Sequence, residues 1–186
     1  MAYLSAARLS ELGFKKLGKD VRISDKASIY NPELIELGDY TRIDDFCVVS
    51  GRVIFGKYNH ITPMCLVAGG VPGIKFSDFC TLAYGVKVFA QSDDYSGATL
   101  TNSLIPKKYK DEKFAEVKFE RHVIVGAGST IMPGVTIREG CSIGAMTLVA
   151  KSTDPWGIYV GVPALRVKER KQDLLELEKK FLDEVK

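Results

Sequence analysis

The sequence predicts an all-β solenoid, a chain wound into short repeated coils, and two observations favour that fold class. Aliphatic or aromatic residues recur every six positions in two runs, and the residue four places after each is mostly small or β-branched. Strands alternate with a period of two and helices with a period of about 3.6, so neither explains this repeat. A short fixed period is typical of coils that stack on one another. The repeated residues are Leu37, Ile43, Val49, Phe55, Ile61 and Val67, then Phe119, Val125, Ile131, Ile137, Ile143 and Val149.

A second inward position follows four residues after each of these. It holds Thr41, Cys47, Val53, Cys65 and Val71 in the first run, and Val123, Ser129, Val135, Cys141 and Thr147 in the second. Cys80 takes the same place after Phe76. Buried thiols behave as compact hydrophobes, and the cysteine spacings match no zinc pattern. We therefore interpret all four cysteines as packing residues, without a metal or a disulfide.

The repeat slips once between the two runs and is less regular before them. Phe76, Leu82 and Val88 keep the period but are offset by three residues, and the glycine-rich stretch 69–73 absorbs the slip. Ile23, Ile29 and Ile35 form an earlier set, in which Glu33 stands at an inward place.

Both ends of the solenoid are predicted to carry a helix. We expect a helical cap over residues 1–18, with an amphipathic helix from Ser5 to Lys16, because terminal caps protect solenoid ends. The β-helix domain then covers 19–165. Apolar residues at helical spacing predict a C-terminal helix over 166–186 that packs on the outside or on a neighbouring chain.

Composition narrows the function classes. The chain has 186 residues, 46% of them hydrophobic, which fits one domain with a substantial core. No apolar stretch approaches the roughly 20 residues of a membrane span, and residues 1–16 lack a signal-peptide core, so we expect a cytoplasmic protein. The net charge of +3 favours anionic small molecules over nucleic acid as partners.

Between Phe89 and Phe119 the repeat stops for about thirty residues. A stretch that long without repeat character is usually functional or disordered. We therefore expect an extruded loop over 89–118 that forms one wall of a binding site, since loops on rigid scaffolds commonly carry function.

The hexads resemble a known family. Val125-Gly-Ala-Gly-Ser-Thr, Ile131-Met-Pro-Gly-Val-Thr and Ile143-Gly-Ala-Met-Thr-Leu look like repeats of the hexapeptide-repeat acyltransferases, which have the left-handed β-helix fold. The resemblance spans roughly residues 20 to 168. It implies a homotrimer with active sites between neighbouring subunits, acetyl-CoA as donor and no metal. The left hand comes from the resemblance alone, because parallel crossovers are normally right-handed.

The same resemblance implies where acetyl-CoA binds. A pantetheine arm needs a flat wall with accessible backbone N–H groups, and its phosphates need cations. The residues expected to bind it are Gly126, Ala127, Gly144, Ala145, Lys151, Arg166 and Lys168. An alternative is that the glycines and alanines only serve the corners of the coil.

Acyl transfer to an amine or hydroxyl needs a group that accepts a proton, and histidine titrates near neutral pH. The run from Asn59 to Val71 is similar to a segment of bacterial sugar N-acetyltransferases whose matching histidine lines the active site, so His60 is the first catalytic candidate. A corner-stabilising histidine is the alternative. His122 is interpreted as an exposed corner residue.

The extruded loop departs from the family pattern. Many family members have a catalytic histidine there, whereas this loop has none and offers Ser92-Asp93-Asp94-Tyr95 instead. Either Asp93 or Asp94 acts as the base or orients the acceptor, or His60 acts with an aspartate across the trimer cleft. The aspartates could equally form a turn. Tyr95 is a candidate for binding a sugar ring.

The sequence thus predicts an acyl-CoA-dependent sugar O- or N-acetyltransferase, acting on a nucleotide-linked or surface-polysaccharide sugar such as one for O-antigen. Two other classes were weighed. A γ-carbonic-anhydrase-like enzyme needs three histidines per zinc, and the chain has two. A non-catalytic trimeric scaffold that binds a partner through the loop is the remaining alternative.

Overall fold

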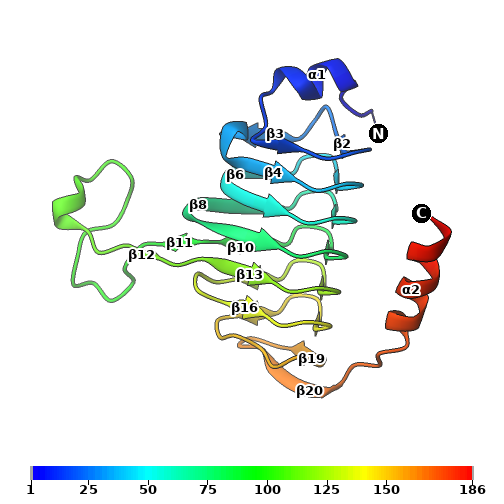
Figure 1. Cartoon of the computed structure of the whole chain (residues 1–186). Helices are drawn as coiled ribbons and strands as arrows, with labels where there is room; N and C mark the ends of the chain where they lie inside the picture. The colour runs from blue at the N-terminus through cyan, green and yellow to red at the C-terminus, as the bar shows by residue number, and fades with distance from the viewer. Residues whose placement is uncertain (1, 186) are drawn as a thin grey trace.

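The computed structural model describes residues 2–185 and has the coiled architecture that the hexads predict. Short strands stack along one axis, each coil lying on the previous one, with the N-terminus at one end (Figure 1). Neighbouring coils pair in parallel and in register: Ile43 lies beside Ile61, and Ile61 beside Leu82. Each inward side chain therefore lies directly beside its counterpart in the next coil.

The strands of the coils form two long sheets. The first sheet contains β1 (Lys16–Leu17), β3 (Ser28–Tyr30), β4 (Ile35–Leu37), β6 (Val48–Phe55), β8 (Leu66–Phe76), β10 (Lys87–Phe89), β13 (Val117–Phe119), β15 (Thr130–Ile131), β16 (Thr136–Ile137) and β18 (Leu148–Val149). The second sheet contains β2 (Arg22–Ile23), β5 (Arg42–Ile43), β7 (His60–Ile61), β9 (Thr81–Leu82), β14 (Ile124–Val125), β17 (Ser142–Ile143), β19 (Gly157–Val160) and β20 (Leu165–Glu169).

The interior is the column of ladders expected from the sequence. All twelve repeated residues of the two runs are at most 2% exposed, and so are the four free cysteines. Phe76 stacks on Phe55 with ring centroids 4.9 Å apart, and on Phe119 at 4.3 Å. Burial raises the pKa of the Cys80 thiol to about 12, so this thiol is inert near neutral pH.

Two predicted inward positions are wrong. Val71 is 76% exposed, because the extra residues of the register slip bulge out of β8 around Gly70 and Gly73, both of which have positive φ. Glu33 lies in a short 3₁₀ helix, η1 (Pro32–Leu34), which carries it to the surface. In both places one side of the coil is longer than a hexad, and the surplus turns outward.

The two helices are shorter than predicted. α1 runs from Ala6 to Glu11 with Ser5 as its N-cap, and it ends before Gly13, whose φ of +72° is left-handed. α2 begins at Leu174 and ends at Glu184. It does not start at Arg166, because 165–169 form β20, which pairs antiparallel with β19 and covers the last coil.

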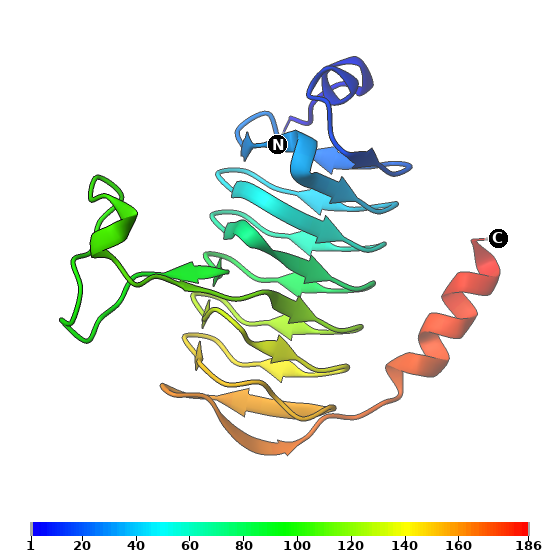
Figure 2. The same cartoon turned by 60° about the vertical axis from the view of Figure 1, so that its left-hand side comes forward.

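The interruption of the repeat stands away from the solenoid (Figures 1 and 2). Its arms form a small antiparallel pair, β11 (Gln91–Ser92) with β12 (Lys113–Phe114), and its tip carries a 3₁₀ helix, η2 (Lys107–Tyr109). Lys110 and Glu112 form an almost wholly covered ion pair, and Glu112 also accepts a hydrogen bond from Gln91. The projecting loop is therefore held by its own contacts.

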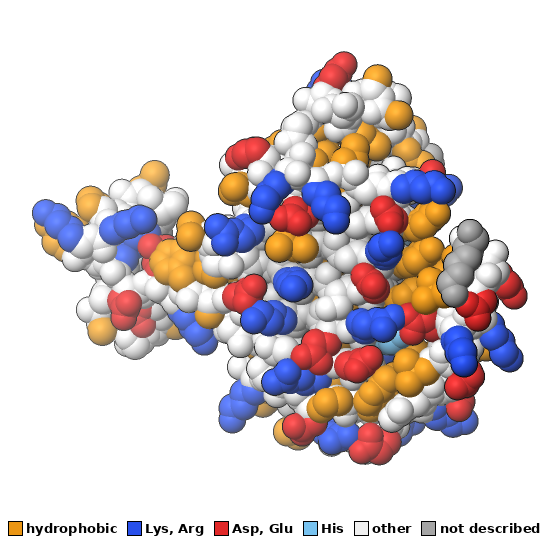
Figure 3. Space-filling model, in the orientation of Figure 1, with side chains coloured by type: hydrophobic (Ala, Val, Ile, Leu, Met, Phe, Trp, Pro, Cys, Tyr) orange, Lys and Arg blue, Asp and Glu red, His pale blue; other side chains and the backbone are white. Residues whose placement is uncertain are grey.

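One corner of the coils carries a column of aromatic side chains in the left-handed backbone region. Tyr40, Tyr58, Phe79 and His122 all have φ near +60°, and their rings stack at 4.8 to 5.2 Å. α2 covers this column through Phe181, which meets Tyr58 and Phe79 edge-on. Hydrophobic side chains gather accordingly where α2 faces the solenoid (Figure 3).

Candidate active site

A compact charged cluster lies on the outer surface of the second sheet, where β5 and β7 are neighbours. His60 points outward from β7, and its Nε2 is 2.8 Å from Oδ2 of Asp44. Arg42, one coil earlier, donates to the same carboxylate from Nε at 2.6 Å and from Nη2 at 3.1 Å. The Asp44 side chain is 3% exposed, whereas that of His60 is 37% exposed. The imidazole is thus held from one side and open on the other.

A second candidate region lies at the base of the projecting loop. A cavity of about 500 Å³ is lined by Asp93 and Tyr95 from the loop and by Phe89 and Met132 from the coils beneath it. Tyr95 is 90% exposed and Asp93 partly buried. One charged, two aromatic and further apolar and polar side chains around a concave surface make this a candidate sugar site.

Asp94 has a different environment from Asp93. Its carboxylate accepts hydrogen bonds from the backbone N–H groups and the hydroxyls of Ser96 and Thr99. The backbone N–H of Ser96 contributes most to lowering the pKa of Asp94, followed by the Ser96 hydroxyl. A carboxyl group with a lowered pKa is a weaker base. These bonds agree with the turn that was the alternative for the aspartates, and the role of Asp94 as base or in orienting the acceptor stays a prediction.

His60 and the loop residues do not meet within one chain. Among residues 2–185, no hydrogen bond, ion pair or cavity joins His60 to Asp93, Asp94 or Tyr95. His60 lies on the second sheet, and the loop leaves the first sheet between β10 and β13. A site that contains both requires groups from two copies of the chain.

The expected cofactor wall is partly different from the prediction. The N–H groups of Gly126 and Gly144 are not accessible, because they donate to the carbonyls of Ile143 and Tyr159 one coil further on. The corner residues Ala127 and Ala145 behave otherwise: within the described chain their N–H groups have no acceptor. The flat wall exists, but its free donors come from the alanines.

The three cations expected to bind the phosphates of acetyl-CoA have different surroundings. Arg166 pairs with Glu169 at 2.6 Å and lies 3.9 Å from Asp154, and its expected role in binding a phosphate stays a prediction. Lys151 and Lys168 are exposed, and neither has an ion-pair partner among the described residues. These two lysines are therefore able to meet a phosphate.

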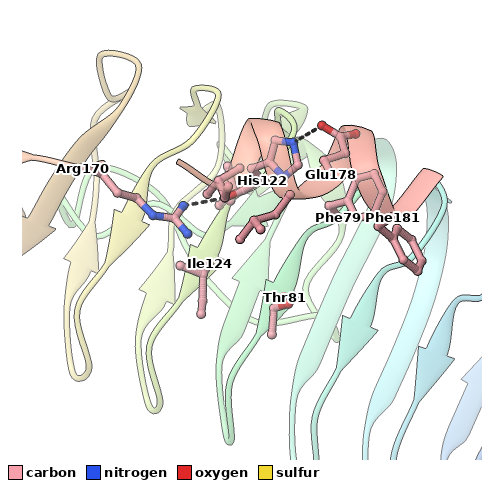
Figure 4. A pocket seen from close by; sticks show the side chains of 10 residues that line it. Phe79, Thr81, His122, Ile124, Arg170, Glu178 and Phe181 are labelled. Carbon is pink, nitrogen blue, oxygen red and sulfur yellow. Dashed lines mark hydrogen bonds and ion pairs between the residues drawn. The ribbon is translucent and has the colours of Figure 1, made fainter. Parts of the chain in front are cut away.

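His122 is not the exposed corner residue that the sequence predicts. Its side chain is 7% exposed, its Nε2 is 2.8 Å from Oε2 of Glu178 on α2, and Arg121 pairs with the same carboxylate. His122 and Glu178 line a cavity of about 310 Å³ under α2, where Arg170 donates to the His122 carbonyl at 2.7 Å (Figure 4). The helix that buries His122 is 56 residues away in sequence.

Within residues 2–185, no group of three or more His, Cys, Asp or Glu side chains is placed to hold a metal ion. Neither α1 nor α2 has the length and apolar character needed to cross a bilayer.

Stacked hexads, an outward histidine–carboxylate pair and a projecting loop define a class of transferase. Residues 116–151 match the family model described as bacterial transferase hexapeptide (six repeats). The chain is 38% identical, over 97% of its length and 95% of the relative's, to the dTDP-4-amino-4,6-dideoxy-D-glucose acyltransferase of Escherichia coli. It belongs to the hexapeptide-repeat acyltransferases, and its fold is their left-handed β-helix.

Solved structures narrow the class. AntD, an N-acyltransferase from Bacillus cereus, was solved with dTDP-4-amino-4,6-dideoxyglucose and coenzyme A; it matches with a TM-score of 0.97 and 46% identity over 98% of each chain. Its complex with dTDP and 3-hydroxybutyryl-CoA also gives a TM-score of 0.97, at 45% identity over 98% of this chain and 97% of AntD. The prediction of an acyl-CoA-dependent sugar acyltransferase is confirmed.

The sequence analysis missed Asp44, Arg42 and Glu178. A signal for Asp44 was present, because it directly follows the inward Ile43, and the same place in other coils holds the uncharged Ser24, Thr62, Ala83, Gly126 and Gly144. A carboxylate among small residues marks an exception in the repeat. Glu178 carried no comparable signal, since it is one of several acidic residues on an amphipathic helix.

Proposed function

We propose that this chain is an N-acyltransferase that moves an acyl group from acyl-CoA to the amino group of dTDP-4-amino-4,6-dideoxyglucose or a closely similar nucleotide-linked amino sugar. The observation that carries the proposal is the near full-length likeness to two relatives associated with this one sugar. The partly apolar cavity at the loop base supports it, because a 6-deoxy sugar presents a methyl group where other hexoses present a hydroxyl.

An amino acceptor also fits the groups available. A neutral amine attacks a thioester with less help from a base than a hydroxyl needs. In the proposed reaction the amine nitrogen forms a bond to the thioester carbonyl carbon and its proton passes to Nδ1 of His60. The carbon–sulfur bond breaks, and the proton ends on the coenzyme A thiolate. One imidazole therefore suffices to take the proton from the amine and to deliver it to the thiolate.

We assign the acceptor contacts to the loop. Asp93 and Tyr95 hold the sugar at the loop base, where they line the cavity of about 500 Å³. Asp94 keeps that segment in shape through its bonds to Ser96 and Thr99. Fixing the acceptor near the thioester supplies much of the rate in transfers of this kind, because it removes the entropy cost of bringing two reactants together.

The active form is proposed to be a homotrimer in which the loop of one protomer reaches the second sheet of the next. Exposed apolar side chains on another corner of the coils support an interface between copies, since large exposed apolar patches commonly mark one. These side chains are Phe46, Met64, Tyr84 and Met146. Such an arrangement joins His60 to Asp93 and Tyr95 from a neighbouring protomer.

For acyl-CoA we propose the wall of the last coils. The free N–H groups of Ala127 and Ala145 bind the amide carbonyls of the pantetheine arm, and Gly126 and Gly144 keep the wall flat. Lys151 and Lys168 bind the phosphates. We place the reaction in the cytoplasm, where both substrates are made, and its product in surface-polysaccharide synthesis such as that of O-antigen.

The proposal is tested by incubating the purified chain with acetyl-, propionyl- and 3-hydroxybutyryl-CoA and measuring thiol release. The acceptors are dTDP-4-amino-4,6-dideoxyglucose and, as the matched control, dTDP-6-deoxyglucose, which has a hydroxyl in place of the amine and the same methyl group. We expect release with the amino sugar only, together with a product heavier by one acyl group in mass spectrometry. Release with dTDP-6-deoxyglucose alone, or with neither acceptor, contradicts the proposal.

A further inference from the structure

One carboxylate breaks the pattern of the outer surface. The position directly after each inward residue of the second sheet lies close to the neighbouring coil: a Cβ on Gly126 would stand 2.5 Å from the backbone nitrogen of Ala145. The other coils have uncharged residues at this position, and only one coil has a carboxylate, Asp44. The uncharged residues are Ser24, Thr62, Ala83, Gly126, Gly144 and Val160. Burying a carboxylate costs several kcal/mol unless it is paired and hydrogen-bonded. Its presence therefore calls for a specific role.

Arg42 already satisfies the charge of Asp44. The guanidinium meets both carboxylate oxygens, with Nε 2.6 Å from Oδ1 and Nη2 3.1 Å from Oδ2. The carboxylate thus has its cation without any contribution from the imidazole. The bond between Asp44 and His60 is additional, and it acts on the orientation of the ring.

The bond to His60 determines where the imidazole carries its proton. An ionised carboxylate only accepts hydrogen bonds, so the ring nitrogen 2.8 Å from Oδ2, which is Nε2, is the donor. In the neutral ring the other nitrogen, Nδ1, then keeps its lone pair. The His60 side chain is 37% exposed, so a substrate can reach the ring.

We propose that Asp44 is the positioning residue of this acyltransferase: it holds His60 in the Nε2–H tautomer and aims Nδ1 at the acceptor amine. This inference rests on the proposed role of His60 as the proton acceptor. Arg42 fixes the Asp44 carboxylate, and Asp44 in turn fixes the ring of His60 on the next coil. Asp44 itself neither touches the substrate nor gains the proton.

The first test compares steady-state kinetics of Asp44→Asn with those of Asp44→Glu and Glu178→Gln. Asp44→Asn is expected to lower kcat by about 10²-fold with little change in KM, within the range of general-base effects. Asp44→Glu keeps the acceptor oxygens and restores part of the loss. Glu178→Gln alters the other histidine–carboxylate pair and keeps kcat. An unchanged kcat in Asp44→Asn, or a change confined to KM, overturns the inference.

The second test does not depend on activity. The chain contains two histidines, so ¹⁵N NMR of the imidazoles gives two ring systems, and His122→Asn leaves only that of His60. We expect neutral His60 to be protonated on Nε2 in the wild-type protein and to become a tautomer mixture in Asp44→Asn. A wild-type His60 protonated on Nδ1 overturns the inference even where Asp44→Asn does not fold.

The outcomes also separate this inference from the proposed function. Absence of acyl transfer in the wild-type chain contradicts the proposed function before any variant is made. Full activity in His60→Ala contradicts the role of His60, and with it this inference, but leaves N-acylation standing. A fall in kcat for His60→Ala without one for Asp44→Asn contradicts only the positioning role.

Discussion

His60 and His122 make the same bond in two different settings. His60 begins β7 and His122 lies just before β14, both on the second sheet's side of the coils, and both have Nε2 2.8 Å from a carboxylate oxygen. The partner of His60 is Asp44, 16 residues away on the adjacent coil, and the ring stays 37% exposed. The partner of His122 is Glu178 on α2, and the ring is 7% exposed. The two histidine–carboxylate pairs are chemically similar, but only His60 is accessible to a substrate, because α2 covers His122.

The comparison separates a group that can react from a group that holds parts together. His60 has an open side on which a substrate can approach. His122 lies between the ring of Phe79, at 5.2 Å, and the helix that carries Glu178, so it ties α2 to the corner of the solenoid. Substitutions at the open and the covered histidine regions should therefore have different effects on activity and stability.

The largest expected effect is the loss of catalysis in His60→Ala. We expect kcat to fall by about 10²- to 10⁴-fold, the usual contribution of a general base. The thermal midpoint should change little, since the ring is partly exposed and packs on few neighbours. Steady-state kinetics and a melting curve check both parts. His122→Ala is the matched control, and we expect the reverse pattern, with kcat kept and stability lowered; a comparable loss of kcat in both variants erases the distinction.

Next in size is the effect of Gly140→Ala on stability. Gly140 has φ +67° and follows His122 in the aromatic corner, where a Cβ would overlap the ring of Trp156. A left-handed backbone costs a non-glycine residue about 1–2 kcal/mol, and overpacking costs about 1–3 kcal/mol. We expect the free energy of unfolding in urea to drop by about 2–4 kcal/mol.

Gly97→Ala serves as its control. Gly97 also has positive φ, but nothing lies within 4 Å of a Cβ there. The backbone cost then remains and the overlap is absent, so we expect a loss of about 1–2 kcal/mol at most. Equal losses in the two variants would mean that the contact with Trp156 contributes nothing.

The sequence predicts the solenoid interior almost completely, and the physical reason is local. Each inward side chain contacts its own counterparts one coil away, so a fixed spacing is enough to identify it, as at Ile43 and Ile61. The prediction for Val71 is wrong because the rule holds only while each side of a coil is a hexad. Where residues are added, the surplus bulges outward and the spacing loses its meaning.

The candidate site is predictable only in part. The similarity of the Asn59–Val71 run identifies His60. Its partner Asp44 is brought near by pairing between coils, and the residue spacing alone does not reveal that contact. His122 is misjudged because burial there comes from α2, a segment with no place in the repeat. Long-range partners decide these roles, and short-range patterns do not contain them.

A smaller effect is expected for Glu178→Gln. The substitution replaces a charge-assisted hydrogen bond to a nearly buried imidazole with a weaker one, and it leaves Arg121 unpaired at a position where water reaches it. We expect a loss of about 1–2 kcal/mol in the free energy of unfolding, in the range measured for bonds to charged groups. Glu176→Gln, on an exposed place of the same helix, is the control and should lie near zero. A loss shared by both would indicate a general effect of helix charge.

The smallest effect is expected for Phe181→Leu, which thins the cover over His122 without touching its hydrogen bond. Phe181 meets Tyr58 and Phe79 edge-on at 5.2 and 6.4 Å, and aromatic pairs of this kind contribute about 0.5–1.5 kcal/mol beyond their burial. A loss of that size in urea unfolding should come with faster hydrogen exchange in α2 alone, because the solenoid keeps its ladders without the helix. The acyl-transfer rate should not move, since His60 lies outside this cover. If the rate falls with the helix contacts, then the two histidine regions are coupled, and the covered pair takes part in what the open pair does.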